Sequence, residues 1–234
     1  MKKKTAGLAL VIYFVVFSFS TAKADELKVG VLNFPPFYMY EKGKEIGGSM
    51  FELLKKILDH IGVQYKIAGY PPPRLFNNLK NGDTNIFMGI KGIEAYDKDV
   101  LYSDMATEQI DVRVFTRGDV PMPQDINGLK GKTIITIRGY SYGGIITFLK
   151  DPANEITLDP TSKHILAFRK LQHKRADYLL DYKGPADNVL QTFSKSDIQE
   201  HSIMRIDVYI IISKKTPNAS ELMRRMEKAY TELK

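Results

Sequence analysis

The chain has 234 residues, of which 34 are lysine or arginine and 27 are aspartate or glutamate, giving a formal net charge of +7. Four of the basic residues and no acidic ones fall within residues 1–24, so removing that segment leaves a net charge of +3. So small an excess argues against a nucleic-acid partner. The lack of cysteine excludes disulfide bonds, thiolate metal sites and a lipid anchor on cysteine.

The first 24 residues predict a secretory signal peptide. Three lysines, Lys2 to Lys4, precede an apolar run from Ala6 to Ser20, and Ala22-Lys23-Ala24 supplies small residues at the cleavage site. The apolar run has 15 residues, short of the ~20 that a membrane-spanning helix needs. We therefore expect cleavage after Ala24, a mature chain that works in the periplasm, and no membrane-embedded segment.

The first part of the mature chain alternates strands and helices. Ser49 and Glu52 are spaced as a capping box, and apolar residues then recur at helical spacing until Gly62. A β-α-β-α-β series of this kind forms a mostly parallel sheet with helices on its faces. The predicted elements are the strand 27–32, the aromatic loop 34–38, the helix 49–61, the strand 64–68, the helix 72–80, the turn 81–83 and the strand 86–89.

The pattern then restarts after a connector rich in proline and glycine, which predicts a second lobe. Two α/β lobes with a cleft between them are the simplest architecture, and ligands favour such clefts. The second series consists of the strand 111–116, the connector 118–131, the strand 133–137, the helix 141–149, the strand 155–158, the helix 162–173, the strand 176–180, the polar stretch 194–201, the strand 208–212 and the helix 218–234.

Residues 138–144, with the sequence Arg-Gly-Tyr-Ser-Tyr-Gly-Gly, form the turn between a predicted strand and a predicted helix. Gly139 to Gly143 match G-x-S-x-G, the nucleophile elbow of serine hydrolases, with Ser141 as the nucleophile. The same turn also predicts an anion site, because a helix N-terminus aims free N–H groups and a positive dipole end at a ligand. The turn alone leaves both a catalyst and a binder open.

Several ordered motifs carry a resemblance to a known family. The chain resembles family 3 of the bacterial extracellular solute-binding proteins, the two-lobed "Venus flytrap" receptors of polar amino acid transporters. The resemblance covers nearly all of the mature chain. Its motifs are the stretch Gly48 to Gly62, Leu79-Lys80-Asn81-Gly82 with the following strand, Tyr102-Ser103-Asp104, Leu129 to Thr133, and Arg138-Gly139.

The resemblance implies an α/β fold of two lobes, joined by crossing strands near Asp111 to Thr116 and Asp207 to Ile212, which close on a ligand. It places residues 25–112 and 208–234 in one lobe and residues 113–207 in the other. The implied function is to capture a small polar or anionic solute, amino-acid-like or carboxylate-bearing, and deliver it to the permease of an ABC transporter. No cofactor and no chemistry are expected, and the protein is expected to be a monomer.

The resemblance also carries binding roles onto individual positions. The family's aromatic platform falls on Phe34, whose ring either stacks on the ligand or packs under its own loop. Gly89 and Lys91 fall where relatives bind the ligand with hydroxyls and backbone, and a solvated surface lysine is the alternative for Lys91. Arg74 resembles an arginine that some relatives place at the cleft edge, and it alternatively caps a neighbouring helix.

Two departures from the family pattern affect the expected ligand. Tyr96 matches the arginine that clamps an α-carboxylate, and it makes no bidentate charged contact. Tyr182 matches the acid that receives the α-amino group, with Asp181 one residue away on the opposite strand face. We therefore expect an anionic or amphipathic solute. The expected site residues are Phe34, Arg74, Gly89, Lys91, Tyr96, Arg138, Tyr140, Ser141, Tyr142 and Tyr182.

Enzymatic alternatives use other residues. A Ser141 hydrolase needs a histidine base and an acid later in the chain, for which His201 with Asp181 or Asp187 are the candidates. Some relatives of this receptor fold are periplasmic dehydratases of cyclohexadienyl acids, and here the candidate acids are Glu94 and Asp181, with solvated carboxylates as the alternative.

Two other possibilities concern histidines and partners. His164 and His173 lie at the two ends of one predicted helix, where we expect them to cap the helix or face solvent. The four histidines are scattered and do not predict a metal site. A ligand-sensing receptor that presents its closed form to a membrane signalling partner uses the same cleft as a transporter receptor, so the sequence leaves that function open.

Overall fold

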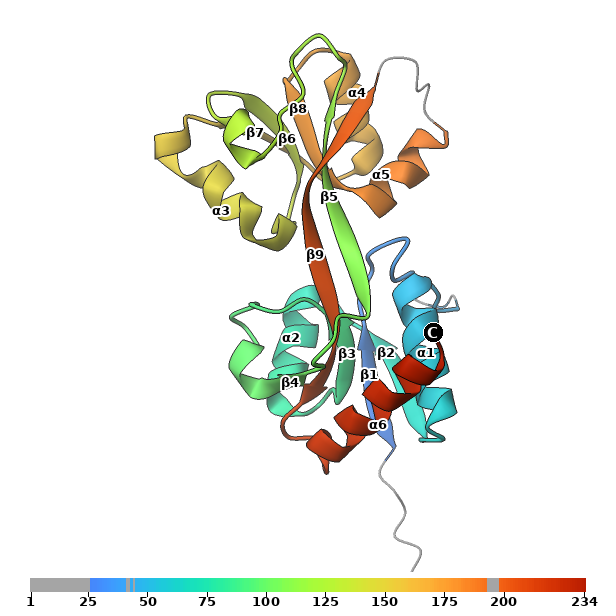
Figure 1. The fold of residues 1–234 in the computed structure, drawn as a ribbon. Coiled ribbons are helices and arrows are strands. Elements are labelled where there is room, and N and C mark those ends of the chain that lie inside the picture. The colour runs from blue at the N-terminus through green and yellow to red at the C-terminus, as the bar shows by residue number, and fades with distance from the viewer. Residues whose placement is uncertain (1–25, 41–42, 44, 193–197) are drawn as a thin grey trace, which may run out of the picture.

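The computed structural model describes residues 26–40, 43, 45–192 and 198–234 as an α/β molecule with two lobes joined by two long strands (Figure 1). The predicted signal peptide lies outside the described residues. No helix within the described part of the chain is long and apolar enough to cross a membrane. The fold class is thus confirmed as α/β.

Lobe 1 is built on the first three strands. β1 (Leu27–Val31) pairs in parallel with β2 (Tyr65–Gly69) and with β3 (Ile86–Gly89), as the β-α-β pattern predicts. β9 (Gln199–Ser213) runs antiparallel to β3 and also to β4 (Val100–Tyr102), so the end of the chain completes this sheet. The lobe 1 helices are α1 (Ser49–His60), α2 (Pro72–Asn81) and α6 (Ala219–Glu232).

Lobe 2 is built on β6 (Thr133–Ile137), β7 (Thr157–Thr161) and β8 (Tyr178–Tyr182) together with part of β5 (Glu108–Thr116). β6 pairs in parallel with β7 and β8, and β8 runs antiparallel to β5. Its helices are α3 (Ile145–Lys150), α4 (His164–Gln172) and α5 (Lys183–Leu190), with 3₁₀ turns at Ile126–Leu129, Tyr142–Gly144 and Pro152–Asn154.

The two lobes are connected by β5 and β9, which pair antiparallel from Glu108 opposite Val208 to Thr116 opposite Gln199. The pairing shifts register between Val112 and Arg113, which marks a bulge in the ladder. The predicted lobe boundaries, 112/113 and 207/208, fall inside these two strands and stay a prediction.

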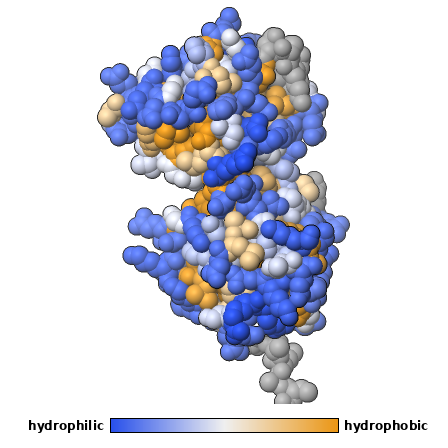
Figure 2. All heavy atoms as spheres, in the orientation of Figure 1, coloured by the Kyte–Doolittle hydropathy of each residue, from blue (hydrophilic) through white to orange (hydrophobic). Residues whose placement is uncertain are grey.

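The pattern of apolar residues explains how each lobe forms its core. All residues of β3 and β8 are buried, as expected for strands covered on both faces. Helix α1 buries Met50, Leu54 and Ile57 along one stripe, which matches the period of an amphipathic helix. Apolar residues also reach the surface near the junction of the lobes (Figure 2).

Four local predictions were wrong. Helix α1 is capped by Gly48 at a φ of 109° and not by Ser49, and no side-chain hydrogen bond caps it. The helix expected from Ser141 is a 3₁₀ turn followed by the short α3 from Ile145, because Tyr142 and both following glycines have positive φ. The polar stretch before residue 208 contains the first part of β9, and α5 was not predicted at all.

Candidate functional site

A cavity of about 410 Å³ lies between the lobes, a volume typical of small-molecule sites. Lobe 1 contributes the loop after β1, the start of α2 and the end of β3 with its following loop, whereas lobe 2 contributes the turn after β6 and the end of β8. The lining residues are Leu32, Asn33, Phe34, Tyr38, Met50, Pro72, Phe76, Phe87, Met88, Gly89, Ile90, Ile93, Tyr96, Ile110, Arg138, Gly139, Tyr140, Ser141, Tyr182 and Ile206.

Lobe 1 presents a largely apolar wall to this cavity. The Tyr38 ring stacks on Phe87 with 5.9 Å between centroids, and its hydroxyl donates a hydrogen bond to the Met88 carbonyl (2.9 Å). The Tyr96 hydroxyl donates to the Ile90 carbonyl (2.8 Å). Burial raises the pKa of both phenols, so both stay neutral and engaged with the backbone. Tyr96 therefore cannot replace a carboxylate-clamping arginine.

Phe34 bridges the two lobes. Its ring stacks on Phe37 at 5.2 Å within its own loop, and meets the edges or faces of Tyr140 (5.6 Å) and Tyr182 (5.2 Å) in lobe 2. These T-shaped contacts are a preferred geometry of aromatic pairs. The ring therefore contributes to the cavity wall and also to the contact between the lobes.

Three tyrosines form the lobe 2 side of the site. The Tyr142 hydroxyl accepts a hydrogen bond from the Ile137 N–H (2.6 Å), and the Tyr142 N–H donates to the Tyr182 hydroxyl (3.0 Å). Tyr142 has a φ of 50°, an uncommon conformation for a bulky residue, and it is fully buried. Tyr142 thus lies behind the cavity wall and fixes the turn, while Tyr140 and Tyr182 line the cavity.

Arg138 is the only charged side chain among the described residues that line the cavity. It follows β6 directly, and its N–H donates to the Thr161 carbonyl (2.8 Å), which anchors the start of the turn. Its guanidinium group has no hydrogen bond or ion pair with the described residues, and the side chain is exposed. The group is therefore available to bind a carboxylate.

A chain of polar groups leads away from the cavity at Tyr140. The Tyr140 hydroxyl lies 3.3 Å from Nε2 of His164, and Nδ1 of His164 lies 2.7 Å from Oδ2 of Asp181. Asp181 is fully buried, and its Oδ1 accepts a hydrogen bond from the Tyr182 N–H (2.8 Å). Burial raises the pKa of Asp181, and the contact with His164 opposes that shift. His164 was expected to cap its helix or face solvent, and that expectation was wrong.

Lys91 and Arg74 do not line the cavity. The Lys91 ammonium lies 3.7 Å from the centroid of the Tyr209 ring and 5.5 Å from that of Tyr102, so two aromatic faces hold it by cation–π attraction. Arg74 is exposed in the first turn of α2. The structure thus brings together seven of the ten predicted site residues at the cavity and leaves these two and Tyr142 outside it.

Gly89 and Ser141 both line the cavity, and their local surroundings differ. A Cβ atom on Gly89 would lie 2.3 Å from Cε1 of Phe87, so only glycine lets that ring fold back against β3. Ser141 precedes the 3₁₀ turn and forms a hydrogen bond with Tyr182. Helix α3 begins only at Ile145 and has six residues, so the turn does not open a long helix as the anion-site interpretation assumed.

The enzymatic alternatives find little support in this geometry. Among the described residues no histidine is hydrogen-bonded to Ser141, and His201 lies in the β5–β9 ladder opposite Val114. Glu94 is exposed and does not line the cavity. Within the described ranges, no group of three or more histidine, cysteine or acidic residues is placed to hold a metal ion.

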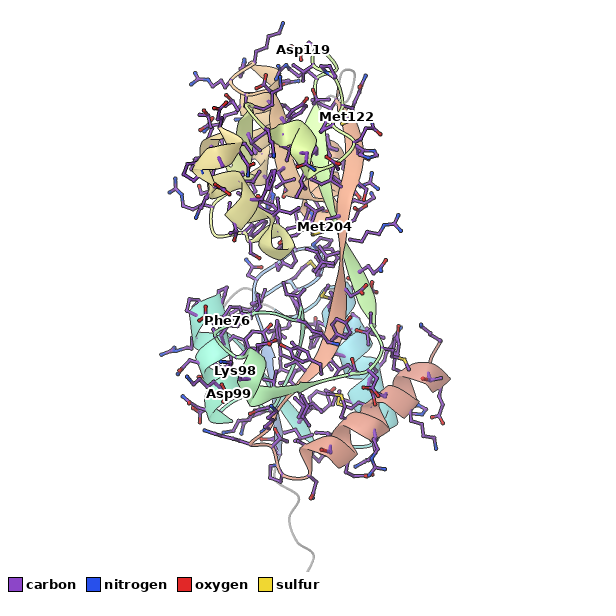
Figure 3. All side chains as sticks on the ribbon, turned by 60° about the vertical axis from the view of Figure 1, so that its left-hand side comes forward. Phe76, Lys98, Asp99, Asp119, Met122 and Met204 are labelled. Carbon is purple, nitrogen blue, oxygen red and sulfur yellow. The ribbon has the colours of Figure 1, made fainter. Side chains whose placement is uncertain are left out.

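Sequence reasoning missed most of the apolar lining. Phe76 lies on α2, a helix that was predicted without a role in the site. Ile206 lies on β9, before the strand that was predicted to begin at residue 208. In Figure 3, Phe76 projects from α2 of lobe 1, and Met204 marks the nearby part of β9 at the junction of the lobes. Only the aromatic loop 34–38 and the turn at Arg138 gave local signals, because the other lining residues converge only in three dimensions.

Comparisons with solved structures show that other proteins share this fold. A mutant of arginine-bound ArgBP from T. maritima superposes with a TM-score of 0.64 at 24% identity, over 89% of this chain and 96% of that one. A histidine kinase sensor domain with similarity to periplasmic binding proteins gives 0.68 at 18% identity, over 89% and 90%. An ancestral arginine-binding protein bound to arginine gives 0.66 at 19% identity, over 89% and 92%.

The sequence comparisons assign the family. A search of curated proteins found no match. The model of the bacterial extracellular solute-binding proteins, family 3, matches residues 27–234, nearly all of the chain that follows the predicted signal peptide. The expected binding fold and the small-molecule role are therefore confirmed at the level of the family. The chain belongs to the bacterial extracellular solute-binding proteins, family 3.

Proposed function

We propose that this protein binds a carboxylate-bearing solute with an apolar, aromatic or branched body between its lobes and delivers it to an ABC transporter. The family supplies the binding role and a working place outside the cytoplasm. The observation that carries the choice of solute is the guanidinium of Arg138, the one charged group among the described residues of a mostly apolar cavity wall.

The charges of the cavity favour a simple carboxylate over an α-amino acid. A carboxylate gains charge-assisted hydrogen bonds from Arg138, whereas an α-ammonium group finds no carboxylate among the described lining residues. Burying an unpaired charge is costly. A ligand with an α-ammonium group would therefore have to keep that group hydrated, or it would bind more weakly. Relatives in the comparison bind arginine, whereas here the cavity carries an arginine of its own.

A matched pair of ligands tests this proposal. 3-Phenylpropanoate and phenylalanine share a phenyl ring, a carboxylate and the same carbon chain, and they differ only in the α-ammonium group. Isothermal titration calorimetry should show binding of 3-phenylpropanoate, and weaker binding of phenylalanine by about 30-fold or more, the equivalent of about 2 kcal/mol for one unpaired polar group. Arginine should not bind. Equal or tighter binding of phenylalanine would contradict the proposal.

Delivery to a transporter is the finer part of the proposal. The proposal also includes a periplasmic location after cleavage at Ala24, which the predicted signal peptide indicates. It further includes a monomeric state, which the family resemblance implies. Adding the ligand-loaded protein to membrane vesicles should stimulate ATP hydrolysis by its transporter. Stimulated autophosphorylation of a membrane kinase instead would favour sensing, the alternative that the fold of the histidine kinase sensor domain permits.

A further inference from the structure

The hydrogen-bonded chain Asp181–His164–Tyr140 has a defined direction of protons. Asp181 Oδ1 accepts from the Tyr182 N–H, and its Oδ2 faces Nδ1 of His164 at 2.7 Å. When Asp181 is ionised, its carboxylate only accepts, so Nδ1 of His164 then carries a proton and donates it to Asp181. The other ring nitrogen, Nε2, then has a lone pair in neutral histidine and a proton in imidazolium.

Tyr140 lines the cavity, and the state of His164 decides what its hydroxyl can offer to a ligand that reaches it. Neutral His164 accepts the phenol proton at Nε2, which leaves only oxygen lone pairs for a ligand. Charged His164 donates to the phenol oxygen across the same 3.3 Å contact, which frees the hydroxyl proton for a ligand. A carboxylate beside Arg138 needs a donor, so it binds better to the second arrangement.

We propose that Asp181 and His164 are positioning residues which orient the Tyr140 hydroxyl, so that capture of a carboxylate takes up one proton on His164. This inference rests on the proposed function, because it assumes an anionic solute in the cavity beside Arg138. It assigns a specificity-determining role to two residues that do not line the ligand cavity.

Few titratable or charged groups lie around His164. Among the described residues, the titratable groups in contact with it are Asp181 on β8 and Tyr140 on the turn after β6. A second pocket of about 310 Å³ lies beside it, and its other walls are Pro35 from lobe 1 and the uncharged residues Ile165, Pro185, Asn188, Val189 and Thr192. On α5, Lys183 and Asp187 pair with each other.

Access and protonation of the neighbours fit this role. The His164 side chain is 25% exposed, so its ring can exchange protons with water, whereas Asp181 is sealed at 0%. Burial raises the pKa of the Tyr140 phenol, so Tyr140 keeps its proton. Its role is to rotate the O–H bond toward His164 or toward the ligand. The proton taken up on binding therefore belongs to His164.

The first test uses the ligand-free protein. Nitrogen-detected NMR of the histidine rings at pH 8, assigned with the variant His164→Gln, should show the His164 proton on Nδ1 and a lone pair on Nε2. The opposite tautomer, with the proton on Nε2, would overturn the inference, because Asp181 would then donate to the ring and Tyr140 would already face the cavity as a donor. This result does not depend on any ligand.

The second test measures proton uptake on binding. Calorimetry with 3-phenylpropanoate in phosphate and in Tris should show uptake of up to one proton, and affinity should fall as the pH rises, by up to about tenfold per pH unit. His164→Gln, which does not titrate, should remove both effects, and Tyr140→Phe should do the same. His173→Gln, at the exposed end of α4, should retain them.

The outcomes separate the two proposals. Binding of 3-phenylpropanoate that is independent of pH and of buffer overturns the inference and leaves the proposed function in place. A pH dependence that persists in His164→Gln also overturns it. If no monocarboxylate binds to the wild-type protein, the proposed function fails and the inference fails with it.

Discussion

Arg138 is the one charged residue among the described residues that line the cavity, and it lies in a different lobe from the family's carboxylate clamp. Family resemblance places the carboxylate clamp at position 96, where this chain has a buried tyrosine bonded to the Ile90 carbonyl. Arg138 supplies the cation from the opposite lobe, at the start of the turn after β6. A ligand held by lobe 1 through apolar contacts and by lobe 2 through Arg138 gains its full affinity only when both lobes engage it.

Replacing Arg138 tests this residue directly. Arg138→Gln should weaken binding of 3-phenylpropanoate by about 30-fold, the equivalent of about 2 kcal/mol for a hydrogen-bonded charge, as measured by calorimetry. Its stability should change little, because the side chain is exposed and has no partner among the described residues. Arg74→Gln removes an exposed arginine outside the cavity and serves as the matched control. Equal losses in both variants would refute the assignment.

The elements with strong local signals were predicted closely. β3 and β6 have the predicted bounds, because each is a short apolar run between turn residues. Helix α5 was missed because its sequence begins Lys-Gly-Pro, and glycine and proline usually break helices, although proline is tolerated in a first turn. Half of β9 was missed because its first part is partly exposed and lacks the apolar run that marks Val208 to Ile212.

The site was predictable in its chemistry and not in its connections. The aromatic loop and the turn at Arg138 carry local signals, so their residues were identified from sequence. The pairing of His164 with Asp181 joins an α4 residue to a β8 residue 17 positions later, and no local pattern encodes it. The cage around Lys91 likewise depends on Tyr209, which comes from the far end of the chain.

The start of helix α5 lies in close contact with the lobe 1 loop. A Cβ atom on Gly184 would lie 2.8 Å from Cδ of Pro36 and 3.0 Å from the Phe37 ring, so this glycine lets the lobe 1 loop rest on the start of the helix. The residue has no positive φ, so larger side chains are compatible with its backbone. The contact is therefore steric and joins the two lobes.

Enlarging this position should hold the lobes apart. Gly184→Ala and Gly184→Val should raise the radius of gyration of the ligand-bound protein in X-ray scattering, in that order, and weaken 3-phenylpropanoate binding in the same order. Gly128→Ala is the control, because its Cβ would meet Pro123 at 2.7 Å inside lobe 2 and should change stability without changing lobe spacing. An unchanged scattering curve for Gly184→Val would rule out this contact as a limit on closure.

At the scale of the whole molecule, the structure has its lobes in contact. Phe34 packs on Tyr140 and Tyr182 across the cleft, and β5 and β9 are the only paired strands that span both lobes within the described chain (Figure 1). Two strands form a narrow connection, so a hinge motion at this connection is the expected way in and out for a solute. Ligand binding should shift the population toward the closed form.

Lobe closure can be followed with fluorescent labels because the chain lacks cysteine. Lys98 lies on the side of lobe 1 and Asp119 lies near the outer end of lobe 2 (Figure 3), so Lys98→Cys with Asp119→Cys gives a pair of sites, one on each lobe, for single-molecule energy transfer. Adding 3-phenylpropanoate should shift the pair toward the shorter distance. Phe34→Ala should reduce the closed population in the absence of ligand, because it removes two aromatic contacts of about 1 kcal/mol each.

Two outcomes would argue against a closing receptor. One is a distance that does not respond to any monocarboxylate in the wild-type protein. The other is a ligand response that persists unchanged when Arg138 and Phe34 are both replaced, since each then contributes nothing to the closed form.

The most direct measurement is native mass spectrometry of the protein purified without denaturation from the cells that make it. A receptor for apolar carboxylates should retain a small molecule whose mass and fragments identify one acid group, an aromatic or branched body and no amine. Release of that molecule should restore the mass of the free chain. A retained α-amino acid, or any other solute with an ammonium group, would contradict the account.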